Sequence, residues 1–146
     1  MKDGVAQSQV YALLQDHRGY LWLGTRGGGL CRFDGTQFET FTEKNGLVNS
    51  YIRKIKEDHQ HRLWIATDNG ISMYNGKTFT NYKPPTKGDP VIVYDIAFDR
   101  NNGKWLATSD GLMHFENGAF SAVSEQVRLP KTTINSILID RQDRIW

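Results

Sequence analysis

The chain has 146 residues, 38% hydrophobic content and a formal net charge of +2, which fits a single domain with a modest core. No basic run exceeds two residues and no apolar run approaches the length of a membrane span, so the composition points away from nucleic acid and from a transmembrane segment. Cys31 is the single cysteine, which excludes an intrachain disulfide.

Four tryptophans divide the sequence into segments of nearly equal length. They recur at intervals of 42, 41 and 41 residues, and each follows an aspartate by six residues. The pairs are Asp16 and Trp22, Asp58 and Trp64, Asp99 and Trp105, and Asp140 and Trp146. Such a period indicates a repeat protein. We interpret both positions as structural: the aspartate caps a hairpin turn, and the tryptophan is buried against the next sheet.

Each repeat predicts four short strands. The first is apolar and ends at the aspartate, as in VYALLQD, and a glycine, Asn102 or Gln142 is expected at the strained position of the turn that follows. The second strand carries the tryptophan, as in LWLGT, LWIAT and KWLAT. The third is entered through a glycine and leads, through a DG or NG turn, to a fourth that alternates aromatic and polar residues. No window longer than about ten residues keeps a helical period.

Four strands in 41 or 42 residues match the length of a β-propeller blade. We therefore expect an all-β fold, a β-propeller fragment of about three and a half four-stranded blades with about 14 strands. The blades are placed at residues 8–42, 50–83 and 91–123, with a partial blade at 132–146.

The segment Gly46–Tyr82 joins a Gly-Leu link, a V-x-x-I-x-x-D type of strand, the D-x-x-G-x-x-W turn and an aromatic hairpin. It resembles the two-component regulator propeller repeat, with His61 where glycine is usual. The resemblance implies the periplasmic or extracytoplasmic sensor of a bacterial hybrid histidine kinase in the inner membrane, and many such sensors are linked to polysaccharide fragments. Because the chain opens in a link and stops at Trp146, halfway through a repeat, we expect a piece of a longer receptor.

The residues indicate no catalytic constellation, no metal site and no cofactor. His59 and His61 form an H-x-H pair inside a turn, without a cysteine or carboxylate cluster of metal-site spacing. The stretch GTRGGGL lacks the lysine of a phosphate loop. A non-enzymatic ligand-binding module is therefore expected. Two alternatives stay open: a propeller enzyme of streptogramin-lyase type, which needs a histidine and a carboxylate converging at the channel mouth, and a protein-interaction scaffold.

Propeller ligands commonly bind at the mouth of the central channel. The loop between the second and third strands and the link between blades lie opposite the first hairpin. The candidate ligand-binding residues are those that differ between copies there: Arg26, Asn49, Tyr51, Asp68, Asn69, Tyr94, Ser109 and Asp110. The expected ligand is an oligosaccharide or a similar small polar molecule.

An open arc of blades leaves apolar sheet faces and a strand edge uncovered. We therefore expect the chain to associate with itself, as a homodimer or by strand exchange, and we expect no nucleic-acid partner.

Overall fold

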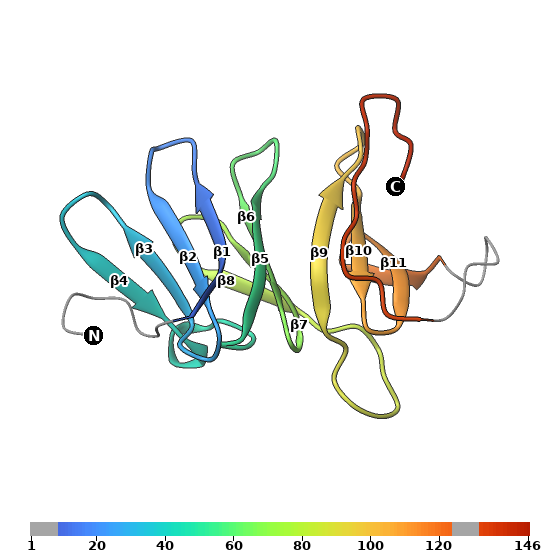
Figure 1. Cartoon of the computed structure of the whole chain (residues 1–146), viewed down its shortest axis with the longest axis horizontal. Helices are drawn as coiled ribbons and strands as arrows, with labels where there is room; N and C mark the ends of the chain where they lie inside the picture. Colours follow the sequence, from blue (N-terminus) through green and yellow to red (C-terminus); the bar gives the residue numbers. More distant parts are fainter. Residues whose placement is uncertain (1–8, 124–131) are drawn as a thin grey trace.

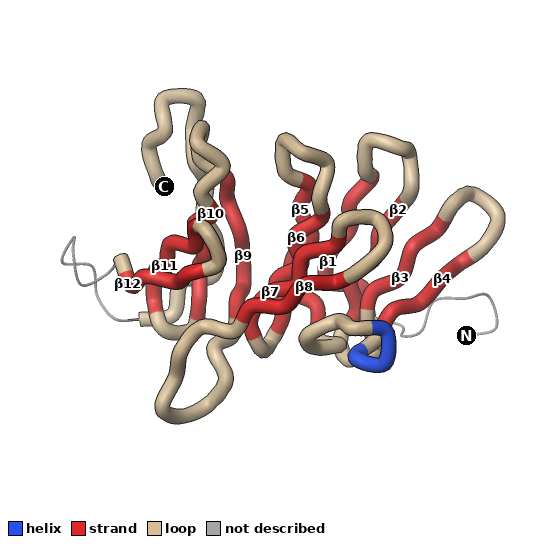
Figure 2. The backbone as a smooth tube through the Cα atoms, turned by 180° about the vertical axis from the view of Figure 1, so that it is seen from behind, coloured by secondary structure: helices blue, strands red, loops and turns tan. Residues whose placement is uncertain are grey.

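The computed structural model describes residues 9–123 and 132–146. Within them, 12 strands form three four-stranded antiparallel sheets that follow one another in an arc (Figure 1). The expected all-β propeller fragment is confirmed. The described helix content is one 3-10 turn, Glu43–Asn45 (Figure 2), so no helix in these ranges has the length or apolarity to cross a bilayer. Residues 4–8 of the first expected link lie outside the described ranges.

Each sheet consists of four consecutive strands paired in chain order. The first sheet contains β1 (Val10–Gln15), β2 (Leu21–Thr25), β3 (Leu30–Phe33) and β4 (Phe38–Phe41). The second contains β5 (Ile52–Glu57), β6 (Leu63–Thr67), β7 (Gly70–Tyr74) and β8 (Phe79–Tyr82). The third contains β9 (Val93–Phe98), β10 (Lys104–Thr108), β11 (Gly111–Glu116) and β12 (Ala119–Ala122). The first strands β1, β5 and β9 lie next to one another at the inner edge of the arc.

The turn between the second and third strands of each sheet requires a glycine. In the second sheet Thr67 Oγ1 donates a hydrogen bond of 2.9 Å to the carbonyl of Gly70. Gly70 has a φ of 89°, and a Cβ there would lie 2.4 Å from the carbonyl oxygen of Tyr82. The same hydroxyl-to-glycine bond recurs in the other two sheets, which explains the spacing of threonine and glycine in the repeat.

The core lies between neighbouring sheets, where a tryptophan of one sheet packs with an isoleucine of the next. Trp22 of the first sheet shares one apolar cluster with Ile55 of the second, and Trp64 shares the next cluster with Ile96 of the third. Burying a tryptophan removes on the order of 200 Å² from water, roughly 5 kcal/mol before entropic costs. The tryptophan is therefore the main anchor by which each sheet holds the next.

Burial of the tryptophans falls along the chain, so the expectation that all are buried is wrong for the last two. Trp22 and Trp64 are buried, Trp105 is half-buried and Trp146 is 70% exposed. The depth depends on what covers the ring. Ile137 packs in the third cluster, near Trp105, but residues 132–146 supply no complete sheet over it.

Residues 132–146 form a hairpin, where the sequence predicts two strands. Leu138 and Trp146 exchange two backbone hydrogen bonds of 3.0 and 2.8 Å, and Ile139 and Ile145 make an isolated bridge. A two-stranded hairpin without further strands is marginally stable in water, which explains the short ladder. The described chain therefore has 12 strands and not about 14.

The strained position of the first hairpin turn is the third residue after the aspartate. Positive φ angles occur there at Gly19 (89°), His61 (62°), Asn102 (65°) and Asp143 (58°). The prediction is right for Asn102 and wrong for Gln142. Asp140 Oδ1 accepts hydrogen bonds from the backbone N–H groups of Gln142 and Arg144, and the residue between them must turn into the left-handed region.

Candidate functional site

The repeated aspartates are occupied by structural hydrogen bonds. Asp58 Oδ1 accepts from the backbone N–H groups of Gln60 and Arg62, at 2.9 and 3.0 Å, and its Oδ2 accepts from Trp64 Nε1 and Arg62 Nε, at 2.8 and 2.9 Å. Burial opposes ionisation of this carboxyl, but the hydrogen bonds, led by that of Trp64, outweigh it and lower the pKa of Asp58. The carboxylate has no free oxygen with which to perform chemistry.

A row of polar and aromatic side chains follows the inner edge of the arc. Tyr11, Arg53 and Tyr94 are the second residues of β1, β5 and β9, and Asn135 holds the equivalent position in the fourth repeat. The Arg53 guanidinium lies 5.9 Å from the centre of the Tyr11 ring and 5.2 Å from that of Tyr94. Both distances fall within the range of cation–π attraction, so the cation is held between two rings.

Asp68 fixes Arg53 from the loop side. Arg53 Nε donates to Asp68 Oδ1 at 2.5 Å and Nη2 donates to Oδ2 at 3.2 Å, a two-pronged ion pair. These hydrogen bonds raise the pKa of Arg53 above its ordinary value, against the opposing effect of burial. Asp68 lies in the turn after β6. Its backbone N–H donates a hydrogen bond to the carbonyl oxygen of Tyr51. The guanidinium plane is therefore set by the neighbouring loop.

Around this row lies an open hollow of about 330 Å³. Its lining residues are Tyr11, Arg53, Lys54, Tyr94, Asn135 and Ser136. Two phenol rings, two cations, an amide and a hydroxyl offer flat apolar faces beside many hydrogen-bonding groups. This combination suits a polar ligand that also has an apolar face.

The sequence-predicted ligand residues divide into two groups. Asp68 and Tyr94 surround Arg53, and Arg26 pairs with the half-exposed Tyr51 through an isolated bridge nearby. The other four take part in turns. The Asn49 side chain accepts from Tyr51 N, the Asn69 and Asp110 N–H groups bond threonine hydroxyls, and Ser109 bonds the backbone of Ile92.

The sequence did not predict Tyr11, Arg53 and Asn135 as ligand residues, because the candidates came only from the loops and from the links between blades. The available signal was the repeat itself. The second residue of the first strand changes from tyrosine to arginine to tyrosine to asparagine, while the apolar residue before it is kept apolar. A position at the inner edge of a propeller whose residue type varies between copies faces the central channel.

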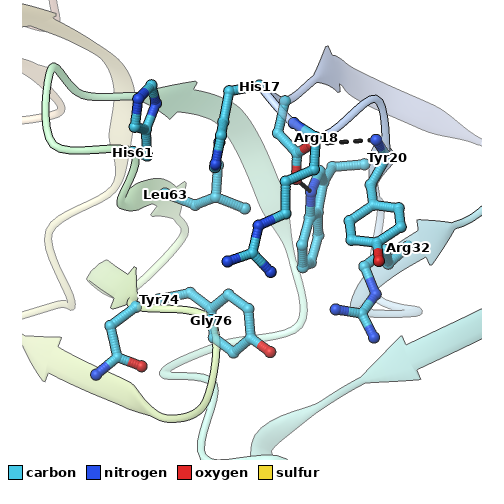
Figure 3. A pocket seen from close by; sticks show the side chains of 11 residues that line it. His17, Arg18, Tyr20, Arg32, His61, Leu63, Tyr74 and Gly76 are labelled. Atoms are coloured by element: carbon cyan, nitrogen blue, oxygen red, sulfur yellow. Dashed lines mark hydrogen bonds between the residues drawn. The ribbon is translucent and has the colours of Figure 1, made fainter.

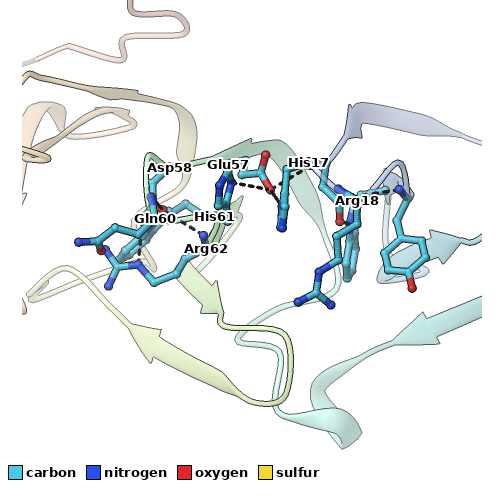
Figure 4. A network of polar contacts seen from close by, with 11 residues as sticks. His17, Arg18, Glu57, Asp58, Gln60, His61 and Arg62 are labelled. Carbon is cyan, nitrogen blue, oxygen red and sulfur yellow. Dashed lines mark hydrogen bonds and ion pairs between the residues drawn. The ribbon is translucent and has the colours of Figure 1, made fainter.

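A second cluster lies at the other end of the strands, on the hairpin turns. His17 of the β1–β2 turn, Glu57 at the end of β5 and His61 of the β5–β6 turn lie together (Figure 4). His17 and His61 also line a hollow of about 40 Å³, with Arg18, Arg32 and Tyr74 among its other lining residues (Figure 3). The H-x-H pair does not converge in this cluster: His59 lines a different depression, beside Phe98.

Two segments, residues 4–27 and 46–69, match the sequence family described as two component regulator propeller. These two segments are similar to two component regulator propeller repeats. Each matched segment runs from the link before a blade through its first two strands, including the aspartate and the tryptophan. A search of curated proteins found no match.

Solved propellers share the fold of this chain. The extracellular domain of a hybrid two component system from B. thetaiotaomicron is 19% identical, with a TM-score of 0.82 over 99% of this chain and 21% of that one. A second such domain from the same organism is 18% identical, with a TM-score of 0.53 over 96% of this chain and 26% of that one. A catalytically inactive virginiamycin B lyase from Staphylococcus aureus is 17% identical, with a TM-score of 0.75 over 100% of this chain and 50% of the lyase.

These structural similarities show the propeller fold of the chain. The chain spans about a fifth to a quarter of the length of the two extracellular domains and half of the lyase.

Proposed function

We propose that the chain is a non-enzymatic ligand-binding part of a bacterial two-component receptor, acting outside the cytoplasm as a sensor. The two component regulator propeller repeats and the likeness to extracellular domains of hybrid two component systems support this assignment. The ligand we propose is an oligosaccharide or a similar small polar molecule.

The observation that carries the proposal is the arginine held between two tyrosines at the inner edge. Sugars present apolar C–H faces, which stack on aromatic rings, and hydroxyls, which bond guanidinium and amide groups in fixed directions. Tyr11 and Tyr94 supply the rings, and Arg53, oriented by Asp68, supplies the directed donors. Pre-orientation of Arg53 lowers the entropic cost of binding.

A glycan array probed with the 146-residue chain tests the proposal, followed by titration of each hit. Tyr11→Ala and Arg53→Gln should weaken binding at least about tenfold, since each removes a directed contact. Arg18→Gln is the charge-matched control, because Arg18 lies on the hairpin turn at the opposite end of the sheet. Binding that survives both inner-edge substitutions, or the absence of any glycan hit, would contradict the proposal.

A lyase of streptogramin type is the second candidate, favoured by the TM-score of 0.75 to the virginiamycin B lyase. The Arg53 hollow is lined by no histidine among the described residues. The histidines that lie close to a carboxylate in the described residues do so at the hairpin end: His17 and His61 beside Glu57, and His114 beside Asp99. Incubation with quinupristin, followed by mass spectrometry, should leave the compound intact, and its consumption would favour the enzyme. A scaffold would bind neither glycan nor quinupristin.

A further inference from the structure

Three potential metal-ligand side chains from two neighbouring sheets gather at the hairpin end of the arc. Their donor atoms, one each from His17, Glu57 and His61, all lie within 4.8 Å of one another. The first sheet contributes His17, and the second contributes Glu57 and His61 (Figure 4). Among the described residues, this is the one group of three or more histidine, cysteine or carboxylate side chains whose donor atoms lie close enough to share an ion.

Glu57 is the centre of the group and is held in place. Its Oε2 lies 2.7 Å from His17 Nδ1 and 3.9 Å from His61 Nδ1. It also accepts a hydrogen bond of 3.3 Å from the backbone N–H of His17. The carboxylate side chain is only 17% exposed, so it sits between the two turns and not in free solvent.

The two imidazole rings lie face to face. Their centres are 3.9 Å apart and their planes differ by 24°. The stacking places two imidazole nitrogens beside the shared carboxylate oxygen, and because imidazole binds a metal in its ring plane, the rings would turn out of the stack to share one ion. Two histidines and one glutamate are a donor set that proteins use for zinc, and imidazole also suits copper and nickel.

The present spacings lie close to those of a metal centre. With zinc–ligand bonds of about 2.1 Å, a tetrahedral site places donor atoms about 3.4 Å apart. The distances from Glu57 Oε2 to His17 Nδ1 and to His61 Nδ1, 2.7 and 3.9 Å, bracket this value, and both imidazoles are exposed and free to turn out of their stack toward a shared ion. The adjoining hollow of about 40 Å³ has room for a water molecule at a fourth position (Figure 3).

We propose that His17, Glu57 and His61 form a binding site for one divalent transition-metal ion, with Zn²⁺ as the best match. Because its ligands come from two sheets, the ion clamps the hairpin ends of the first and second blades. The site is independent of the Arg53 hollow, which lies at the opposite end of the strands.

Calorimetric titration of the 146-residue chain with Zn²⁺ alone, in a non-coordinating buffer, tests the proposal. One ion per chain is expected. His17→Ala, Glu57→Gln and His61→Gly should each weaken the affinity at least about tenfold, since even loss of a group that only supports a ligand costs about 10- to 100-fold. His59→Ala is the matched control: a histidine of the same turn, exposed and outside the cluster, whose loss should leave the affinity unchanged.

His61→Gly separates binding from folding. His61 has a φ of 62° at the turn position where the first copy carries Gly19, so glycine fits the backbone there. Zn²⁺ should raise the melting temperature of the unaltered chain and of His59→Ala, and should raise that of His61→Gly clearly less at the same concentration. Equal affinities in His17→Ala, His61→Gly and His59→Ala, or no saturable binding by the unaltered chain, would overturn the proposal.

Discussion

Trp64 donates a hydrogen bond of 2.8 Å from its indole nitrogen to Asp58 Oδ2, six residues earlier in the chain. The same bond recurs in the other three copies, at 2.8, 3.0 and 3.1 Å. It forms whether the ring is buried, as in Trp64, or largely exposed, as in Trp146. The hairpin alone therefore aims the ring, and the next sheet only covers it.

The first prediction concerns the energetic weight of that bond. Asp58→Ala removes the turn hydrogen bonds to the backbone N–H groups of Gln60 and Arg62 and leaves the buried Trp64 indole N–H without its partner, and should lower the free energy of unfolding by about 3 kcal/mol. Asp140→Ala removes the same bond where the ring is exposed, so water replaces the lost acceptor and the loss should be small. Urea denaturation measures both. Equal losses would show that burial does not decide the cost.

The second prediction is a loss of stability in acid. Hydrogen bonds lower the pKa of Asp58 and Asp99 against the effect of burial, and those from Arg144 and Trp146 lower that of Asp140 to about 2. A carboxyl whose pKa is depressed in the folded state stabilises the fold above its unfolded pKa of about 3.9, and this contribution disappears as the pH falls through the folded pKa. The melting temperature should therefore fall between about pH 4 and pH 2. The fall should be smaller in Asp58→Asn, which no longer titrates there, and an unchanged slope would contradict this origin.

The third prediction tests the contact between the first two sheets. A Cβ on Gly24 would lie 2.3 Å from Cγ2 of Ile52, a fully buried side chain. Gly24→Ala should destabilise the chain by about 1–3 kcal/mol, because neither sheet can retreat without opening the core. Gly88→Ala is the control, because Gly88 has no atom within 4 Å of its added Cβ and no left-handed φ. Thermal unfolding compares the melting temperatures of the two variants. Similar values would mean that the contact between the first two sheets accommodates the added methyl group.

The period of the sequence was enough to predict the 12 strands of the three complete sheets, because each copy repeats the same turns and the same alternation. What it did not reveal are contacts between copies. Tyr11 and Arg53 occupy positions equivalent to that of Tyr94, which the sequence did predict, and a comparison of equivalent positions in the copies reveals them. The histidines are different. His17 is equivalent to His59, 42 residues later, yet its ring stacks on His61. That pairing depends on how two neighbouring turns lie in space, which a sequence pattern does not show.

The last prediction is self-association of the 146-residue chain. Ile55, Ile96 and Ile137 hold the same position in the second, third and fourth repeats, where each packs on the preceding sheet and is at most 5% exposed. Leu13, the equivalent residue of the first repeat, is 66% exposed. At the other end of the arc Leu138 and Trp146 are 62% and 70% exposed. Apolar side chains gathered on an open sheet face favour contact with a second copy.

Light scattering at micromolar concentration should therefore give a mass above 16.7 kDa. Leu13→Asp places a charge on the open face and should shift the chain toward the monomer. Thr80→Asp adds the same charge on the exposed side of β8 and should have no such effect. Association that persists in Leu13→Asp would point to exchange of terminal strands, since pairing of backbone edges does not depend on that side chain. A monomeric unaltered chain would show that these side chains tolerate water, and self-association would then be wrong.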